Sequence, residues 1–193
     1  MVPRNRVTLP HILQAAATIV DTDGVDALTM SSLAQKLGIR SPSLYNHSEG
    51  LPDIRRRLAV SGLEQLRDAL MRSTVGRSRD EAIREMAKSY LNFVRTRPGL
   101  YEITILAPTD LDDELQKVSQ EIVDLVTQVL KAYQVGSADE IHIARTLRSL
   151  LHGFASLEQR GGFGIPIDLD ESFTHMVDTF LMGLHKRYLA KNQ

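Results

Sequence analysis

The chain has 193 residues, of which 42% are hydrophobic, and its 23 basic and 24 acidic side chains give a formal net charge of −1. This length suffices for one or two small domains with a hydrophobic core, and the mixed composition excludes a disordered chain. The sequence contains no cysteine, which excludes disulfides, thiolate metal sites and cysteine nucleophiles. No run of about 18 apolar residues occurs, so we expect a cytoplasmic protein that does not enter a membrane.

Basic residues are slightly enriched toward the N-terminus. Residues 1–60, which include Arg4 and Arg6, contain seven Lys and Arg against five Asp and Glu, a net charge of +2. Residues 61–193 carry 16 bases against 19 acids, a net charge of −3. A contact with a polyanion such as DNA is therefore expected at the N-terminal end.

Apolar residues recur with the helical period along the whole chain. The pattern predicts an all-α fold of about nine helices, over 9–23, 30–37, 41–47, 51–72, 79–96, 100–106, 111–133, 137–157 and 170–189. Thr8, Thr29 and Ser41 are N-cap candidates for the first three helices, and Gly38 is the C-cap candidate for the second. We expect a helix-turn-helix domain at 1–50 and a helical regulatory and dimerisation domain at 51–193.

Residues 29–47 carry the pattern that predicts function. Two short helices separated by Gly38-Ile39-Arg40 have the spacing of a helix-turn-helix motif, with Leu33, Ala34 and Leu44 as buried anchors. Polar side chains around them suit phosphates and base edges, and the predicted DNA-contact residues are Thr8, Thr29, Arg40, Ser41, Ser43, Tyr45, Asn46 and His47. The alternative is an ordinary helical corner whose hydroxyls only cap helices.

The run from Thr29 to His47, with Leu33-Ala34, Gly38 and Leu44-Tyr45 at fixed spacing, resembles the DNA-binding domain of the TetR family of transcriptional regulators. The resemblance covers about residues 8–58 and implies a DNA-binding regulator that is not an enzyme. The family usually continues with an aromatic residue and a phosphate-contacting lysine, where this chain has Ser48 and Leu51. The amides near Gly50, or one of Arg55, Arg56 and Arg57, are candidates to replace that contact. The alternative is that these three arginines only form a solvent-exposed face of their helix.

Residues 79–187 resemble regulatory domains of the same family that carry a Trp-His-Gly signature, which here reads Leu151-His152-Gly153. The resemblance implies a homodimer that binds a small-molecule effector. The apolar stripes of the last two helices predict a four-helix dimer interface that contains Leu147, Phe154, Phe173, Phe180 and Leu184. The alternative is that these stripes only seal the core of the protomer.

A further set of residues predicts the effector pocket. Met86, Tyr90, Phe93 and Tyr101 supply thioether and aromatic surface that suits a mainly apolar guest with one or two polar groups. The alternative is ordinary core packing. No metal-ligand spacing, phosphate loop or catalytic motif is found, so we expect no metal, cofactor or enzymatic activity. The chain is predicted to be a repressor, and the competing interpretation is a helical ligand-binding or scaffolding protein that has lost DNA binding.

Overall fold

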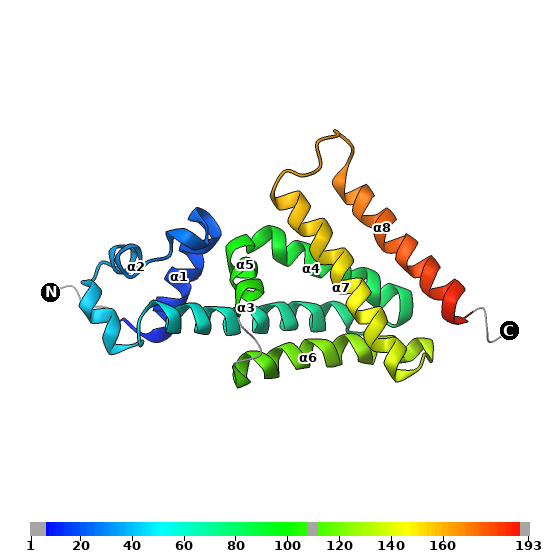
Figure 1. Cartoon of the computed structure of the whole chain (residues 1–193), viewed down its shortest axis with the longest axis horizontal. Coiled ribbons are helices and arrows are strands. Elements are labelled where there is room, and N and C mark those ends of the chain that lie inside the picture. The colour runs from blue at the N-terminus through cyan, green and yellow to red at the C-terminus, as the bar shows by residue number, and fades with distance from the viewer. Residues whose placement is uncertain (1–6, 108–111, 190–193) are drawn as a thin grey trace. The chain divides into compact units, whose positions relative to one another are not determined.

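The computed structural model describes residues 7–107 and 112–189, and every regular element in these ranges is helical (Figure 1). The α-helices are α1 (Leu9–Asp23), α2 (Met30–Leu37), α3 (Leu51–Thr74), α4 (Arg79–Thr96), α5 (Pro98–Leu106), α6 (Asp113–Leu130), α7 (Ser137–Gln159) and α8 (Leu169–Leu184). The 3₁₀ turns are η1 (Val25–Ala27), η2 (Ser41–Asn46) and η4 (Lys131–Tyr133), and η5 (His185–Leu189) is a π-helical turn. The all-α prediction is confirmed.

Contacts divide the chain into two compact units. The first contains the chain up to Gln65 together with Arg97–Val118, and the second contains Leu66–Thr96 together with the chain from Ser119 onward. The domain boundary expected at residue 50 stays a prediction. Arg4, Arg6 and Leu111, which the sequence analysis used, lie outside the described residues.

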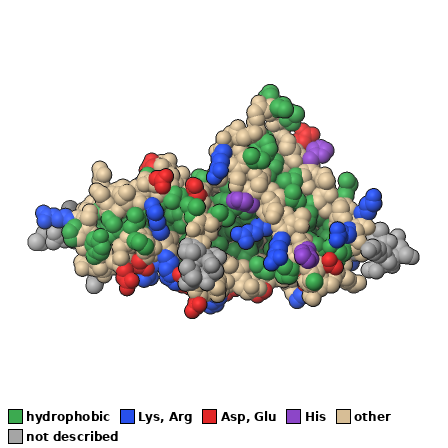
Figure 2. Space-filling view, in the orientation of Figure 1, with side chains coloured by type: hydrophobic (Ala, Val, Ile, Leu, Met, Phe, Trp, Pro, Cys, Tyr) green, Lys and Arg blue, Asp and Glu red, His purple; other side chains and the backbone are tan. Residues whose placement is uncertain are grey.

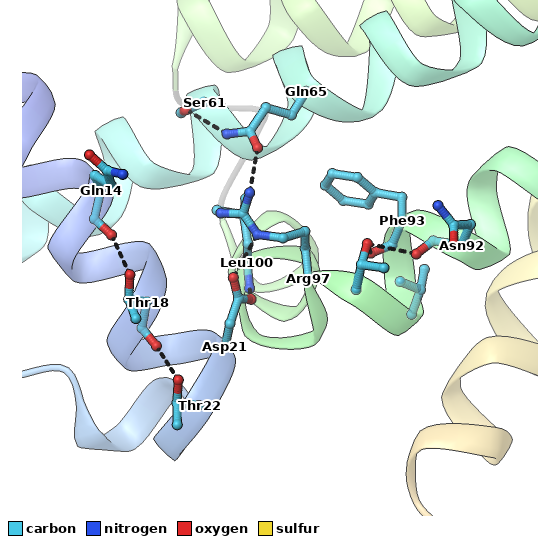
Figure 3. Close-up of polar contacts among 12 residues, drawn as sticks. Gln14, Thr18, Asp21, Thr22, Ser61, Gln65, Asn92, Phe93, Arg97 and Leu100 are labelled. Atoms are coloured by element: carbon cyan, nitrogen blue, oxygen red, sulfur yellow. Dashed lines mark hydrogen bonds and ion pairs between the residues drawn. The ribbon is translucent and has the colours of Figure 1, made fainter.

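The first unit is built around the apolar face of α1. Ile12, Ala16 and Val20 are almost fully buried, as their helical spacing predicts. α5 packs on this helix so closely that a Cβ at Gly99 would lie 1.9 Å from the carbonyl oxygen of Val20. The Leu100 amide donates to Oδ1 of Asp21 at 2.8 Å, so α1 also caps α5 (Figure 3).

The second unit packs α4 against α7 and α8. The apolar faces that meet are buried, with Ile83 and Met86 from α4, Leu151 from α7 and Val177 from α8 among them. Two ion pairs at the edges join the same helices: Arg95 of α4 to Glu158 of α7 at 2.6 Å, and Arg84 of α4 to Asp178 of α8 at 2.9 Å. α7 and α8 run antiparallel and are joined by a loop over 160–168 (Figure 1).

In the described ranges, no helix combines the length and the apolar character needed to cross a membrane.

Candidate nucleic-acid interface and regulatory surfaces

α2 is the first helix of the helix-turn-helix pair, and both of its ends are fixed locally. Oγ1 of Thr29 accepts from the Ser32 amide at 3.0 Å, and Oγ of Ser32 accepts from the Thr29 amide at 3.0 Å, which forms a reciprocal capping box. At the other end Gly38 adopts φ +66°, the left-handed conformation that closes many helices. Both predicted caps of α2 are confirmed.

The predicted N-cap position of α1 is confirmed, although the Thr8 side chain does not form a capping hydrogen bond. Thr8 occupies the N-cap position, but its hydroxyl makes no capping hydrogen bond and the residue is exposed. Only its carbonyl takes part, accepting from the Ile12 amide at 3.0 Å. The Thr8 residue is therefore exposed and its side chain does not cap the helix.

The second member of the pair is a 3₁₀ turn rather than the predicted α-helix. The Ser43 amide donates to the Arg40 carbonyl and the His47 amide to the Leu44 carbonyl, each at 2.9 Å and each three residues back. Arg40 is the N-cap of η2, so the predicted cap at Ser41 is wrong. A segment of six residues with one buried anchor has little packing to impose α-helical winding, and short pieces of chain commonly take the 3₁₀ form.

The polar residues predicted to contact DNA surround that buried anchor. Leu44 is fully buried, whereas the Tyr45 side chain next to it is 61% exposed. Arg40, Asn46 and His47 are also exposed, while Ser41 and Ser43 are half-buried. The turn therefore presents a guanidinium, a phenol, an amide and an imidazole on its outer side. Lys36 on α2 is a further exposed cation, which the sequence pattern did not include among the candidates although it lies on the polar face of that helix.

Ser48 replaces the aromatic residue usual in the family, and the structure gives it a role. Its side chain is buried, and its Oγ donates to the Leu44 carbonyl at 3.2 Å. The Ser48 amide donates to the same carbonyl at 3.1 Å. Both bonds close the C-terminal end of η2, so this residue stabilises the turn instead of filling space with a ring.

The three consecutive arginines near the start of α3 are all engaged within the first unit. Arg55 donates to the backbone carbonyls of Val25 and Leu28 at 3.4 and 3.5 Å. Arg56 binds the carboxylates of Asp112 and Glu114, and its guanidinium holds the pKa of Asp112 below the ordinary value. Arg57 donates to Asp53, one turn earlier on the same helix, at 2.8 Å.

The predicted effector residues are divided between the two units. Met86, Tyr90 and Phe93 lie on one face of α4 in the second unit, with side chains 2 to 7% exposed. Tyr101 belongs to α5 in the first unit and is equally buried. Among the described residues, no group of three His, Asp or Glu side chains is placed to hold a metal ion.

Four of the five residues predicted for the dimer interface are buried in the protomer. Leu147, Phe154, Phe173 and Leu184 are at most 8% exposed, and the rings of Phe154 and Phe173 pack edge to face with centroids 5.1 Å apart. Phe180 is half-buried. Apolar periodicity correctly identified the buried faces of α7 and α8. In the structure these four side chains pack against other residues of the same chain.

An open groove of about 920 Å³ lies between α7 and α8 within the second unit. Ile143, Thr146 and Leu150 line it from α7, and Phe180 and Gly183 are among the residues that line it from α8. Asp139 and Arg187 also line it, so the two full charges in its wall are of opposite sign. Apolar and hydroxyl side chains with one charge of each sign are suited to packing against a protein surface.

The regulatory part of the chain matches a known sequence family. Residues 83–180 match the family described as "Tetracyclin repressor-like, C-terminal domain". An uncharacterized HTH-type transcriptional regulator of Bacillus subtilis, YobS, is 42% identical over 187 residues, which cover 95% of this chain and 96% of that protein. Another uncharacterized HTH-type transcriptional regulator, from Mycobacterium tuberculosis, is 34% identical over 183 residues, which cover 94% of this chain and 84% of that protein.

The fold is also found among solved structures. A protein of unknown function from Rhodococcus sp. RHA1 has a TM-score of 0.81 at 24% identity, covering 95% of this chain and 98% of that one. The capped α2, the turn at Gly38 and η2 have the arrangement of a helix-turn-helix motif. Together with the relatives, this arrangement indicates a DNA-binding regulator of transcription. The chain belongs to the TetR family of transcriptional regulators. The Trp-His-Gly subtype stays a prediction.

Proposed function

We propose that the chain is a homodimeric repressor that binds operator DNA through α2 and η2 and leaves it when a small, mainly apolar effector binds. The observation that carries the DNA contact is the exposure of Arg40, Tyr45 and Asn46 on a turn anchored by the buried Leu44. A guanidinium suits phosphate or guanine, and an amide suits adenine. The residues proposed to support these contacts are Thr8, Thr29, Ser41, Ser43 and His47.

Binding to selected genomic fragments, including DNA upstream of the protein's own gene, tests this proposal. Fluorescence anisotropy at several salt concentrations should show that Arg40→Ala and Tyr45→Ala each weaken binding by about 1–3 kcal/mol. Arg145→Ala, which removes an exposed arginine from α7, is the matched control and should bind as the wild type does. Wild-type affinity in both head variants would contradict this placement of the reading turn. Binding to no fragment would favour the alternative of a ligand-binding protein without DNA contact.

The proposed dimer forms through the groove faces of α7 and α8. Gly153 lies inside α7 and Gly183 lines the groove from α8, and a Cβ at either would meet nothing within 4 Å in the protomer. Glycine inside a helix costs about 1 kcal/mol relative to alanine. No contact within the protomer requires a glycine at these two positions, whereas the close approach of a helix from a second protomer would require one.

Two substitutions separate these effects. Because the protomer has room for a methyl group, Gly153→Ala and Gly183→Ala should make the separated protomer more resistant to urea, by up to about 1 kcal/mol. The same variants should weaken dimerisation in sedimentation equilibrium, because the methyl group holds the partner helix away. A variant that stabilises the protomer and dimerises as well as the wild type would place the interface elsewhere.

The proposed effector contacts are Met86, Tyr90 and Phe93 of α4 in the second unit, and a role for Tyr101, which belongs to the first unit, stays a prediction. Thioether and aromatic side chains accommodate flat, apolar molecules, and a phenol can orient a polar group. A library of such compounds should contain one that raises the melting temperature and releases DNA. Phe93→Ala should abolish that response, and Tyr90→Phe tests the hydroxyl. A library in which no compound gives either response would make the protein a constitutive binder.

A further inference from the structure

The loop between α7 and α8 exposes large apolar side chains in a protein that otherwise buries most of them. Leu157 at the end of α7 and Phe163, Ile165 and Ile167 in the loop are between 36 and 73% exposed, and we call these four residues the apolar cap. Figure 2 shows hydrophobic side chains at the tip of this hairpin. Clustered apolar exposure of this kind marks a surface that contacts something else.

The apolar cap is presented by an ordered loop. Gly161 adopts φ +66°, and the next amide, that of Gly162, donates to the Leu157 carbonyl at 2.7 Å. The Phe163 ring packs on the Phe154 ring with centroids 5.0 Å apart, which ties the loop to the core of the second unit. Ile165 and Ile167 are linked to each other by a backbone bond of 2.8 Å. Their exposure is therefore built into the loop.

The apolar cap continues the groove face of α7. Ile143, Thr146 and Leu150 line the groove at helical spacing. The same spacing leads through Gly153 to Leu157, because residues three or four apart share one face of a helix. The face of α7 that lines the groove therefore continues to Leu157, the member of the apolar cap that lies on this helix.

The charge of the loop indicates which partner fits it. Residues 161–167 contain no charged side chain. In a two-fold symmetric interface a segment near the axis meets its own copy, so any charge there would face a like charge. We propose that the apolar cap contacts a second copy of this chain and extends the dimer interface from the groove onto the loop. This inference rests on the proposed dimer.

Replacing the two most exposed members of the apolar cap tests the inference. Ile165→Ser with Ile167→Ser removes two apolar side chains that contribute little to the protomer, because most of their surface is in solvent. Sedimentation equilibrium should show the dimer dissociation constant raised by at least about tenfold. Val75→Ser, at an equally exposed apolar position on the turn after α3, is the matched control and should dimerise as the wild type does.

The possible outcomes separate this inference from the dimer itself. If the loop variant dimerises normally while Gly183→Ala weakens association, the α7–α8 interface stands and the inference is overturned. If Val75→Ser weakens association as much as the loop variant, the effect is unspecific and the inference is also overturned. A wild-type chain that sediments as a monomer at every concentration overturns both proposals.

A thiol probe gives a second readout that does not depend on weakening the dimer. Because the chain has no cysteine, Ile165→Cys introduces a single thiol, and Val75→Cys is its control. Above the dimer dissociation constant the thiol at 165 should react with a maleimide at least about tenfold more slowly than the thiol at 75. Dilution below that constant should abolish the difference. Equal rates at both concentrations would show that no second copy covers the loop.

Discussion

Nε of Arg97 donates to Oδ2 of Asp21 at 2.7 Å, and this ion pair joins the start of α5 to the last turns of α1. The other oxygen of the same carboxylate caps α5 through the Leu100 amide. Arg97 is held on its far side by Gln65, whose Oε1 accepts from the guanidinium at 2.8 Å (Figure 3). Asp21 therefore satisfies a charge and a backbone donor at once, in a partly buried place.

Removing that carboxylate should destabilise the first unit. Asp21→Ala leaves the Arg97 guanidinium and the Leu100 amide without their acceptor, and we expect a loss of about 1–3 kcal/mol in urea unfolding. Lys88→Ala is the control, since it breaks an exposed pair with Glu85 at 2.8 Å and should cost about 0.5 kcal/mol or less. Equal losses in the two variants would show that the Asp21 carboxylate contributes no more than an exposed ion pair.

A methyl group at residue 99 should be harmful for a steric reason. The Cβ of Gly99→Ala would overlap the Val20 carbonyl, so α1 and α5 must separate, at a cost of about 1–3 kcal/mol or more. Gly164→Ala, where a Cβ meets nothing within 4 Å, should unfold at nearly the wild-type urea concentration. Similar midpoints for both variants would mean that the contact between α1 and α5 is looser than the structure shows.

Sequence pattern predicted the elements that depend on local chemistry. The apolar spacing of Ile12, Ala16 and Val20 gave the buried face of α1, and Thr29 with Gly38 gave both ends of α2. The winding of η2 was not predictable in this way. The same six residue types can form a 3₁₀ turn, with hydrogen bonds to the third residue back, or an α-helix, with bonds to the fourth. Which of the two forms is adopted depends on how Leu44 and Ser48 pack in the folded unit.

The sequence also does not show which residues a buried side chain packs against. Periodicity shows that Leu147 and Phe154 face an apolar environment, but the same spacing serves a protomer core or a dimer interface. Tyr101 illustrates the same limit, because its aromatic character gave no sign that it belongs to the unit in which α5 packs on α1, whereas Tyr90 belongs to the other unit. Contacts between residues distant in the chain decide these matters.

The arginines of α3 should differ in their effect on DNA binding. Arg57 is held by one carboxylate on its own helix, so a phosphate can compete for it, whereas Arg56 is held by two carboxylates from outside α3. We expect Arg57→Ala to weaken DNA binding and to reduce the salt slope by about 1. Arg56→Ala should lower the urea midpoint and leave the salt slope unchanged. The reverse pattern would make Arg56 the phosphate contact.

Stability at low pH should depend on Asp80. Burial favours a higher pKa for this carboxyl, but hydrogen bonds from Tyr133 and His185 and the charge of Arg84 outweigh it, so the pKa lies below the ordinary 3.8. A lowered pKa in the folded state means that the ionised Asp80 stabilises the fold above about pH 4 and that this contribution is lost as the pH falls further.

Asp80→Asn should therefore be less stable than the wild type at neutral pH, with a difference that shrinks as the solution is acidified. Urea unfolding at about pH 7 and pH 3 measures it. The exposed Asp124→Asn is the control and should follow the wild type at both values. A difference between Asp80→Asn and the wild type that stays constant with pH would show that the hydrogen-bond geometry matters and the charge does not.

The 3₁₀ winding of η2 determines which side chains can be used together. With three residues per turn, Ser43 lies directly above Asn46 on one edge, and Pro42 lies above Tyr45 on the next. An α-helix over the same residues would turn Asn46 about 60° away from Ser43. An operator that the Ser43 hydroxyl and the Asn46 amide contact together would therefore favour the 3₁₀ form of this segment. An operator that converts the segment to an α-helix would lose this pair of contacts. In the proposed complex, the hydrogen-bond register of these six residues would therefore influence which DNA sequence is bound.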